Sequence, residues 1–462
     1  MSLAFELAKR VSALRYEDLP PQAVHWAKVG ILDFVGVTLA GHNEPTAQLL
    51  ALSLGGVAGP ARIFGEEKRV SILDAALING TASHALDYDD CNNTIGGHPS
   101  APILPALFAV ADEFGASGRA FINAYACGFE VETKLGMAVN LYHYMKGWHP
   151  TATLGVFGSA AACARLLNLS AEQTAVAIAI AASFASGIKA NFGTMVKPLH
   201  VGHCSRNGLL AARLAQQGYT ANAAGAFEDK HGFFKVFNGE GNYAAEKILP
   251  AWGNPYDIVE PGIAIKQYPC CGSTHSAVDA MLILVSKHDI HPEQVESIES
   301  WTHARRLEHT NRPDPQSSLD AKFSVQYCLA RALADRKVTM EQFEGDEYKD
   351  PKIRSLLGRI KAATYTTAQF PAENHFGAEV KVTLRDGSVH STKVDQPYGR
   401  TSRNPLPPEM LKAKFVNCAQ GVLPESTVAR IYAAIDGFEQ LSDVRDVTAL
   451  TSPSPRNAAH AA

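Results

Sequence analysis

The chain has 462 residues, of which 46% are hydrophobic and 19% are charged, and its formal net charge at pH 7 is −4. This composition excludes a disordered or fibrous protein, and the length allows two or three domains at roughly 100–200 residues each. Because the chain carries no overall positive charge, we expect no nucleic-acid partner.

The first twenty residues predict an amphipathic helix, because charged side chains interrupt the apolar core that a secretion signal needs. Residues 174–188 carry no charge, but about 15 residues are fewer than the roughly 17–25 that span a bilayer. We therefore expect a cytoplasmic protein without a membrane partner. The eight cysteines show no C-x-x-C spacing, which predicts reduced thiols.

Residues 1–262 are rich in alanine and leucine at helical spacing, which predicts a helical domain. Ser170 and Gln173 form a capping-box pattern before an apolar run and predict a helix start. Lys197-Pro198 predicts another helix start, and Gly218 predicts the end of that helix.

Residues 263–400 change to an alternating pattern, which predicts a smaller α+β domain. The segment 295–304 alternates like a strand, and residues 378–394 predict a hairpin around Asp386-Gly387 with a type I′ turn. Residues 401–446 return to helical spacing and are expected to dock on the first domain, whereas 447–462 predict a loose tail. The predicted fold class is mainly α.

The segment 84–100 contains the first dense group of polar residues, including His84, Asp87, Asp89, Asp90 and His98. These side chains allow three interpretations: a divalent metal site, capping of backbone groups, or a metal-free active-site segment. No second His or Asp group has recognisable ligand spacing. We therefore favour the metal-free active site.

His149 lies between a tryptophan and a proline, directly before a helix rich in small residues. A lone histidine is usually a core or surface group. The free N–H groups of a helix entrance favour an anion, however, and make His149 a candidate functional residue.

Lys197, His200, His203 and Arg206 place basic side chains at the start of a predicted helix. The helix dipole disfavours cations there, so this choice of residues is unusual. A solvated basic face and a receptor for carboxylate or phosphate both remain open at this point.

Lys266 begins the segment KQYPCCGSTH, at the boundary between the two predicted domains. Ligand sites favour such boundaries, and a desolvated lysine has a lowered pKa that suits a general base. The thiols of Cys270 and Cys271 suggest a nucleophile instead, but no paired base accompanies them.

These segments resemble the MmgE/PrpD family, whose members include 2-methylcitrate dehydratase, cis-aconitate decarboxylase and iminodisuccinate epimerase. The resemblance rests on six motifs in the same order: LDYDD, GGHPS, GWHPTATLGVFGSAAA, KPLHVGH, KQYPCCGSTH and QPYGR. It implies a large all-helical domain built from both chain ends, a smaller lid domain, and a homodimer through the helical domain. It also implies one pocket surrounded by Asp87, His98, His149, Lys197, Lys266 and Tyr327.

Cys91 stands where the decarboxylase-like members have threonine, and the stretch from Asp87 to His98 is one residue longer than theirs. This departure favours an epimerase of an iminodisuccinate-like dicarboxylate. A hydro-lyase or decarboxylase acting on a 2-methylcitrate-like or cis-aconitate-like acid is the alternative. A non-catalytic helical scaffold is a further alternative from another class.

Proton abstraction next to a carboxylate needs a base, cationic groups that stabilise the enediolate, and exclusion of water. We expect His149 and Lys266 to be the base and acid, and Lys197 and His98 to hold carboxylates, with Asp87 orienting a neighbouring base. Cys91, His200 and Tyr327 complete the predicted binding residues. The sequence has no phosphate loop, dinucleotide fingerprint or metal spacing, so we predict no cofactor.

Overall fold

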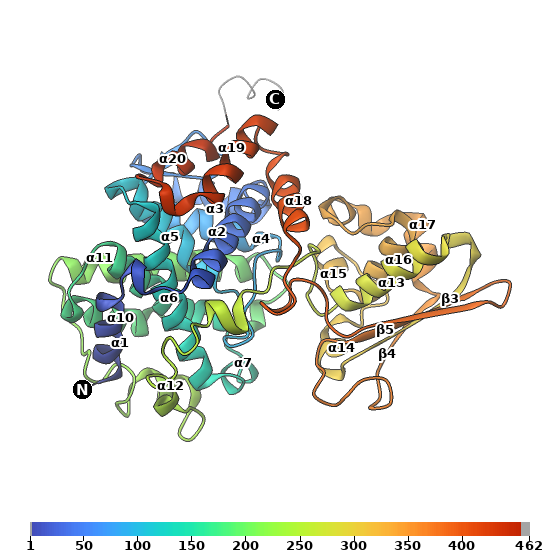
Figure 1. Ribbon diagram of the computed structural model, residues 1–462, viewed down its shortest axis with the longest axis horizontal. Coiled ribbons are helices and arrows are strands. Elements are labelled where there is room, and N and C mark those ends of the chain that lie inside the picture. The colour runs from blue at the N-terminus through green and yellow to red at the C-terminus, as the bar shows by residue number, and fades with distance from the viewer. Residues whose placement is uncertain (1, 454–462) are drawn as a thin grey trace. The chain divides into compact units, whose positions relative to one another are not determined.

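The structure is a computed structural model that describes residues 2–453, and its elements are mainly helices, as predicted (Figure 1). Backbone contacts divide it into two compact units. The first unit draws on Met1–Ile265, Thr401–Arg403 and Pro408–Ala462, and the second on Lys266–Arg400 and Asn404–Pro407.

The first unit is a bundle of helices with one two-stranded ribbon, β1 (Ala61–Arg62) and β2 (Arg69–Val70). Its α-helices are α1 (Leu3–Ala13), α2 (Pro21–Gly41), α3 (Pro45–Leu54), α4 (Ile72–Ala85), α5 (Ser100–Phe114), α6 (Gly118–Val139), α7 (Tyr142–Met145), α8 (Pro150–Thr153), α9 (Gly155–Leu166), α10 (Ala171–Phe184), α11 (Val196–Gln216), α12 (Phe233–Asn238), α18 (Pro408–Ala419), α19 (Glu425–Asp436) and α20 (Arg445–Thr448).

Local sequence signals set several of these helix ends. The capping box at the start of α10 is present, because Ser170 accepts from the backbone of Gln173 and Gln173 accepts from Ser170. Pro198 lies in the first turn of α11, and Gly218 follows that helix with a φ of 85°. The helix expected after His149 is interrupted at Leu154, which separates α8 from α9.

Helix α9 is almost wholly enclosed, since every residue from Gly155 to Ala164 is buried. Its small side chains pack inside the first unit against α5, α6, α10 and α11. These small side chains are therefore used for packing within the unit.

Helix α2 is long and apolar enough to cross a membrane, and 78% of its most apolar window is buried inside the structure. The uncharged stretch 174–188, which was the candidate in the sequence, belongs in its helical part to the shorter α10. A buried core helix of a soluble protein passes the same length and hydropathy test.

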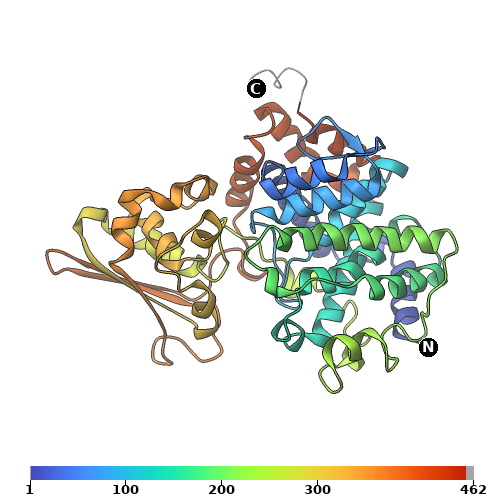
Figure 2. The same cartoon turned by 180° about the vertical axis from the view of Figure 1, so that it is seen from behind.

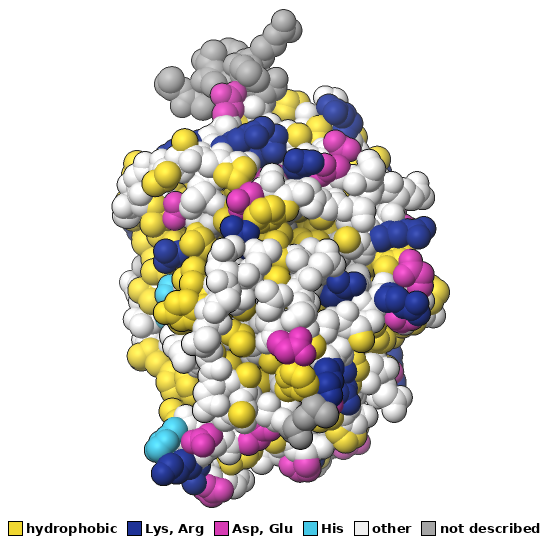
Figure 3. Space-filling model, turned by 90° about the vertical axis from the view of Figure 1, so that its left-hand side faces the viewer, with side chains coloured by type: hydrophobic (Ala, Val, Ile, Leu, Met, Phe, Trp, Pro, Cys, Tyr) yellow, Lys and Arg dark blue, Asp and Glu magenta, His cyan; other side chains and the backbone are white. Residues whose placement is uncertain are grey.

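Figure 3 shows one face of the molecule on which positive and negative side chains are interspersed.

The second unit is a four-stranded sheet with helices on one face. The strands are β3 (Val295–Thr302), β4 (Ile360–Thr364), β5 (Ala378–Leu384) and β6 (Val389–Val394), in the order β4-β3-β5-β6; β3 and β4 are parallel and the other pairs antiparallel. The helices are α13 (His275–His288), α14 (Ala304–Thr310), α15 (Ser318–Lys322), α16 (Val325–Asp335) and α17 (Pro351–Leu357). Alternate residues of β5 are buried beneath α13, as the period of two requires.

The predicted hairpin exists, but its turn is not type I′. Gly387 has a φ of 87°, whereas Asp386 is not in the left-handed region. The backbone N–H of Leu384 donates to Ser388, and that of Gly387 donates to Leu384. A three-residue loop therefore closes the hairpin, with the glycine alone supplying the positive φ.

The predicted tail, 447–462, is only partly described. Residues up to Thr451 belong to α20 and a short 3₁₀ turn, and Val447, Thr448 and Thr451 are buried, so this part is packed and not loose. The rest of that prediction, from residue 454, lies outside the described residues.

Candidate active site

Helices α4 and α11 bring two of the candidate motifs together. A Cβ built on Gly202 of α11 would lie 2.1 Å from the carbonyl oxygen of Leu77 in α4, so only glycine permits this approach. The rear view shows α11 as a long green helix of the first unit (Figure 2). The crossing places the start of α11, with Lys197, beside the end of α4, with His84.

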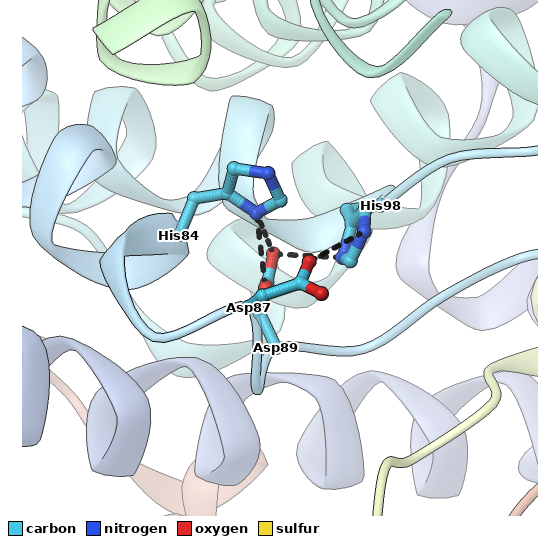
Figure 4. A group of neighbouring side chains, drawn as sticks. All are labelled: His84, Asp87, Asp89 and His98. Atoms are coloured by element: carbon cyan, nitrogen blue, oxygen red, sulfur yellow. Dashed lines mark hydrogen bonds and ion pairs between the residues drawn. The ribbon is translucent and has the colours of Figure 1, made fainter. Parts of the chain in front are cut away.

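Asp89 lies between two histidines at the centre of this cluster (Figure 4). Its carboxylate is 2.9 Å from Nδ1 of His84 and 3.0 Å from Nδ1 of His98. The rings of the two histidines are 4.4 Å apart, centroid to centroid. All three side chains are buried, so Asp89 fixes the orientation of both rings out of contact with bulk water.

Asp87 lies in the turn after α4, where its φ of 53° is one that aspartate tolerates better than most residues. One of its oxygens is 2.6 Å from Nζ of Lys197 and 3.7 Å from Nε2 of His98. The two predicted carboxylate-binding cations, Lys197 and His98, therefore both contact carboxylates of the chain itself.

His149 is the residue before α8, and its side chain is buried. Its Nδ1 lies 3.3 Å from Nδ1 of His200 on α11, and its ring is 5.8 Å from that of His84. The ring of Phe192 meets it edge to face at 4.9 Å. The structure thus joins His149 and His200 to the cluster that holds His84, Asp87, Asp89, His98 and Lys197.

The histidines of the cluster differ in charge. Burial, together with the nearby His84 and Lys197, holds the pKa of His149 well below its ordinary value. Burial also lowers the pKa of His84 to about 4. Burial acts in the same direction on His98, but the Asp89 carboxylate and the nearby Cys91 together outweigh it and raise the pKa of His98 to about 10. At neutral pH, His149 and His84 are neutral and His98 is a cation.

His84, Asp87, Asp89 and His98 also offer ligand atoms that lie within 4.8 Å of one another, a spacing that a metal ion could use. Asp87 and Asp89 are already matched by two cations, Lys197 and protonated His98. Added positive charge would be repelled by both. The charges therefore fit an acid–base site better than a cation site.

The other predicted residues have different surroundings. The sulfur of Cys91 is 3.8 Å from Nδ1 of His98. Lys266 is buried and is the first residue of the second unit. Tyr327 lies in the core of the second unit, where its hydroxyl donates to the carbonyl of Gln342 and accepts from Arg331.

His84 and Asp89 belong to the polar cluster seen in the sequence, but neither was predicted to be a site residue. Asp89 contacts both histidines, which is the orienting role expected of Asp87. One feature of the sequence indicated this role: His84 lies in the last turn of a helix, and a sharp turn follows that helix. Only the structure shows that this turn points Asp89 back toward the ring.

Curated relatives of known name match nearly the whole chain. The chain is 29% identical to "Cis-aconitate decarboxylase" of Homo sapiens, covering 98% of this chain and 95% of the relative. It is 30% identical to the protein of that name from Mus musculus, covering 97% and 93%. It is 25% identical to "2-methylcitrate dehydratase" of Cupriavidus necator, covering 91% of each.

These names correct the favoured activity. Decarboxylases and dehydratases are lyases, so the isomerase assignment, which rested on Cys91 and on one additional residue in a loop, is wrong. The isomerase assignment depended on differences in one loop, whereas the similarity to the lyases extends over nearly the whole chain. Residues 5–246 match the MmgE/PrpD N-terminal domain and residues 268–440 match the MmgE/PrpD C-terminal domain. The chain belongs to the MmgE/PrpD family.

Proposed function

We propose that this chain is a lyase that acts on a small tricarboxylic acid, and that decarboxylation of a cis-aconitate-like substrate is its activity. The observation that carries the proposal is the identity of 29–30% with two cis-aconitate decarboxylases over almost their full length. The cluster around His149 supplies groups that such a reaction needs.

In decarboxylation, the bond between a carbon and one carboxylate group breaks, carbon dioxide leaves, and the electron pair is captured by a proton. We assign delivery of that proton to His149. The negative charge of a bound substrate raises the pKa of a nearby histidine, so the neutral imidazole takes up a proton when the substrate binds. Lys197 and His98 add positive charge near His149, although each of them also pairs with an aspartate of the chain.

Dehydration of a 2-methylcitrate-like acid is a second candidate, and the neutral state of His149 favours it. A neutral, buried imidazole is ready to accept a proton from carbon. In this reaction a C–H bond and a C–O bond break, His149 takes the proton, and the hydroxide leaves as water after receiving a second proton. The predicted donor of that proton is Lys266.

Proton NMR in deuterated water separates the two candidates. We expect cis-aconitate to lose carbon dioxide and to give an unsaturated dicarboxylate that carries one deuterium. A product that keeps all three carboxylates, formed from 2-methylcitrate, supports dehydration instead. If neither acid changes at micromolar enzyme, the lyase proposal fails.

Substitution of Lys266 tests whether the second unit contributes to catalysis. The predicted lid role of residues 263–400 requires that Lys266→Met lowers turnover at least 10²-fold while the protein stays folded. We also expect a homodimer, an expectation that rests on the family resemblance alone. Light scattering that gives a mass near 50 kDa, that of one chain, contradicts it.

A further inference from the structure

Arg306 of α14 is a half-buried arginine with no carboxylate within ion-pair distance among the residues that the structure describes. Its Nη1 donates to the hydroxyl of Ser273, and its Nε donates to the carbonyl of His375. Both partners are neutral. They satisfy hydrogen bonds but leave the positive charge without a counter-charge.

Arg331, in the same unit, shows the usual arrangement. Its buried guanidinium contacts the carboxylates of Asp335, Glu347 and Asp350. Charged groups removed from water are normally paired in this way, because an uncompensated buried charge is strongly destabilising. Arg306, which is half-buried, has no such carboxylate partner among the described residues.

A second guanidinium adds to the positive charge. The guanidinium carbons of Arg306 and Arg400 lie 4.4 Å and 4.5 Å from the centre of the Phe376 ring. A Cβ built on Gly272 would be 3.8 Å from Nη1 of Arg400, next to Ser273, which Arg306 contacts. Both cationic groups therefore lie against neighbouring residues of one turn.

The turn adds positive character of its own. Residues 271–274 lead directly into α13, a helix of 14 residues whose N-terminal dipole favours an anion. Desolvation and the charge of Arg400 lower the pKa of Arg306 to about 9. Even so, Arg306 remains a cation at neutral pH. A bound anion would compensate its positive charge.

We propose that Arg306, supported by Arg400 and Ser273, binds a carboxylate group of a small polycarboxylate. The geometry favours a planar oxyanion, because a guanidinium presents two parallel N–H groups that match the two oxygens of a carboxylate. The identity of the ligand rests on the proposed function; the anion-binding character of the turn does not.

The test measures binding of tricarballylate, a tricarboxylate with no double bond or hydroxyl group to react, by calorimetry on the full chain. We expect Arg306→Gln to weaken binding at least tenfold and Arg306→Lys, which keeps the charge but loses the planar fork, to weaken it less. Arg305→Gln is the matched control, since Arg305 is the exposed neighbour on α14, and it should stay within twofold of the wild type. Equal affinity of Arg306→Gln and Arg305→Gln overturns the proposal.

Two further readouts separate the alternatives. Circular dichroism shows whether Arg306→Gln is folded; if it is not, Arg306→Lys decides, and an affinity equal to that of the control overturns the proposal. Sulfate distinguishes a substrate carboxylate from a free anion: if Arg306→Gln abolishes stabilisation by sulfate but leaves tricarballylate binding unchanged, the carboxylate assignment is wrong. Because tricarballylate does not react, a failure of the lyase proposal leaves this measurement intact.

Discussion

The Nδ1 atoms of His149 and His200 lie 3.3 Å apart, so one ring donates a hydrogen and the other accepts it. When His149 is the donor, its Nε2 keeps a lone pair that can take a proton from the substrate. His200, half-buried on α11, then fixes the tautomer of His149. His149 is the proposed acid–base residue, and His200 is a positioning residue.

We expect His149→Gln to lower kcat by about 10²- to 10⁴-fold, the usual contribution of a general acid or base. His200→Leu removes the acceptor and should lower kcat by about tenfold, whereas His200→Gln, whose amide oxygen accepts the same hydrogen bond, should recover part of that loss. Steady-state kinetics with the productive substrate measures both effects. His203→Leu is the control, because His203 lies one turn further along α11 and contacts Asn207 instead. A control variant as slow as His200→Leu would contradict the positioning role.

The second prediction concerns His98, whose pKa of about 10 in the folded protein lies above its ordinary value of 6.5. A group with a raised pKa stabilises the fold fully below its unfolded pKa, and this stabilisation is lost as the pH rises toward the folded pKa. His98→Gln should therefore lower the free energy of unfolding by ~1–3 kcal/mol at pH 6 and by much less at pH 10.

Urea unfolding of both proteins at several pH values measures this difference. His231→Gln is a suitable control, because His231 is exposed and its replacement should change the free energy of unfolding by less than about 0.5 kcal/mol at every pH. A loss of stability in His98→Gln that is constant from pH 6 to pH 10 would show that His98 is not protonated in the folded protein.

Much of the fold follows from local pattern, and the site follows only in part. The capping box of α10 and the strand 295–302 depend on neighbouring residues, so the sequence was enough to predict them. The hairpin was predicted correctly but its turn was not, because Asp386-Gly387 is compatible with more than one loop length. The contact of His149 with His200 joins residues 51 positions apart and depends on how α11 packs, which no local pattern specifies.

The third prediction concerns metal ions. Asp87 pairs with Lys197, and Asp89 pairs with protonated His98. The two carboxylates therefore attract a divalent ion only weakly, and the two cations repel it. Exhaustive dialysis against EDTA should leave at least nine-tenths of the turnover. Asp89→Asn serves as a comparison, because it disturbs the same cluster without involving a metal and should abolish most of the turnover. Loss of activity with EDTA and recovery with a divalent ion would make His84, Asp87, Asp89 and His98 a metal site.

The last prediction concerns Glu132, which lies on α6 and is fully buried. Neither of its carboxyl oxygens has a hydrogen-bond partner among the described residues. Burial, assisted by the nearby Asp90, raises the pKa of Glu132 well above its ordinary value of 4.5. Between pH 4.5 and that raised pKa, the folded state binds a proton that the unfolded state releases, so stability falls as the pH rises.

Glu132→Gln replaces the carboxyl group with a neutral amide of the same shape and removes this pH dependence. We expect the variant to be more stable than the wild type at pH 8, by up to about 1.4 kcal/mol for each unit of pKa shift, and to lose its advantage near pH 4.5. Glu130→Gln, on the same helix, provides the contrast. Burial also raises the pKa of Glu130, to about 7, but Glu130 accepts from the backbone of Gly253 and Asp257 and pairs with Lys134, so its replacement should destabilise the protein. Thermal melts at both pH values test the pair, and a Glu132→Gln variant less stable than the wild type at pH 8 would mean that Glu132 is ionised and bound to a partner in the native state.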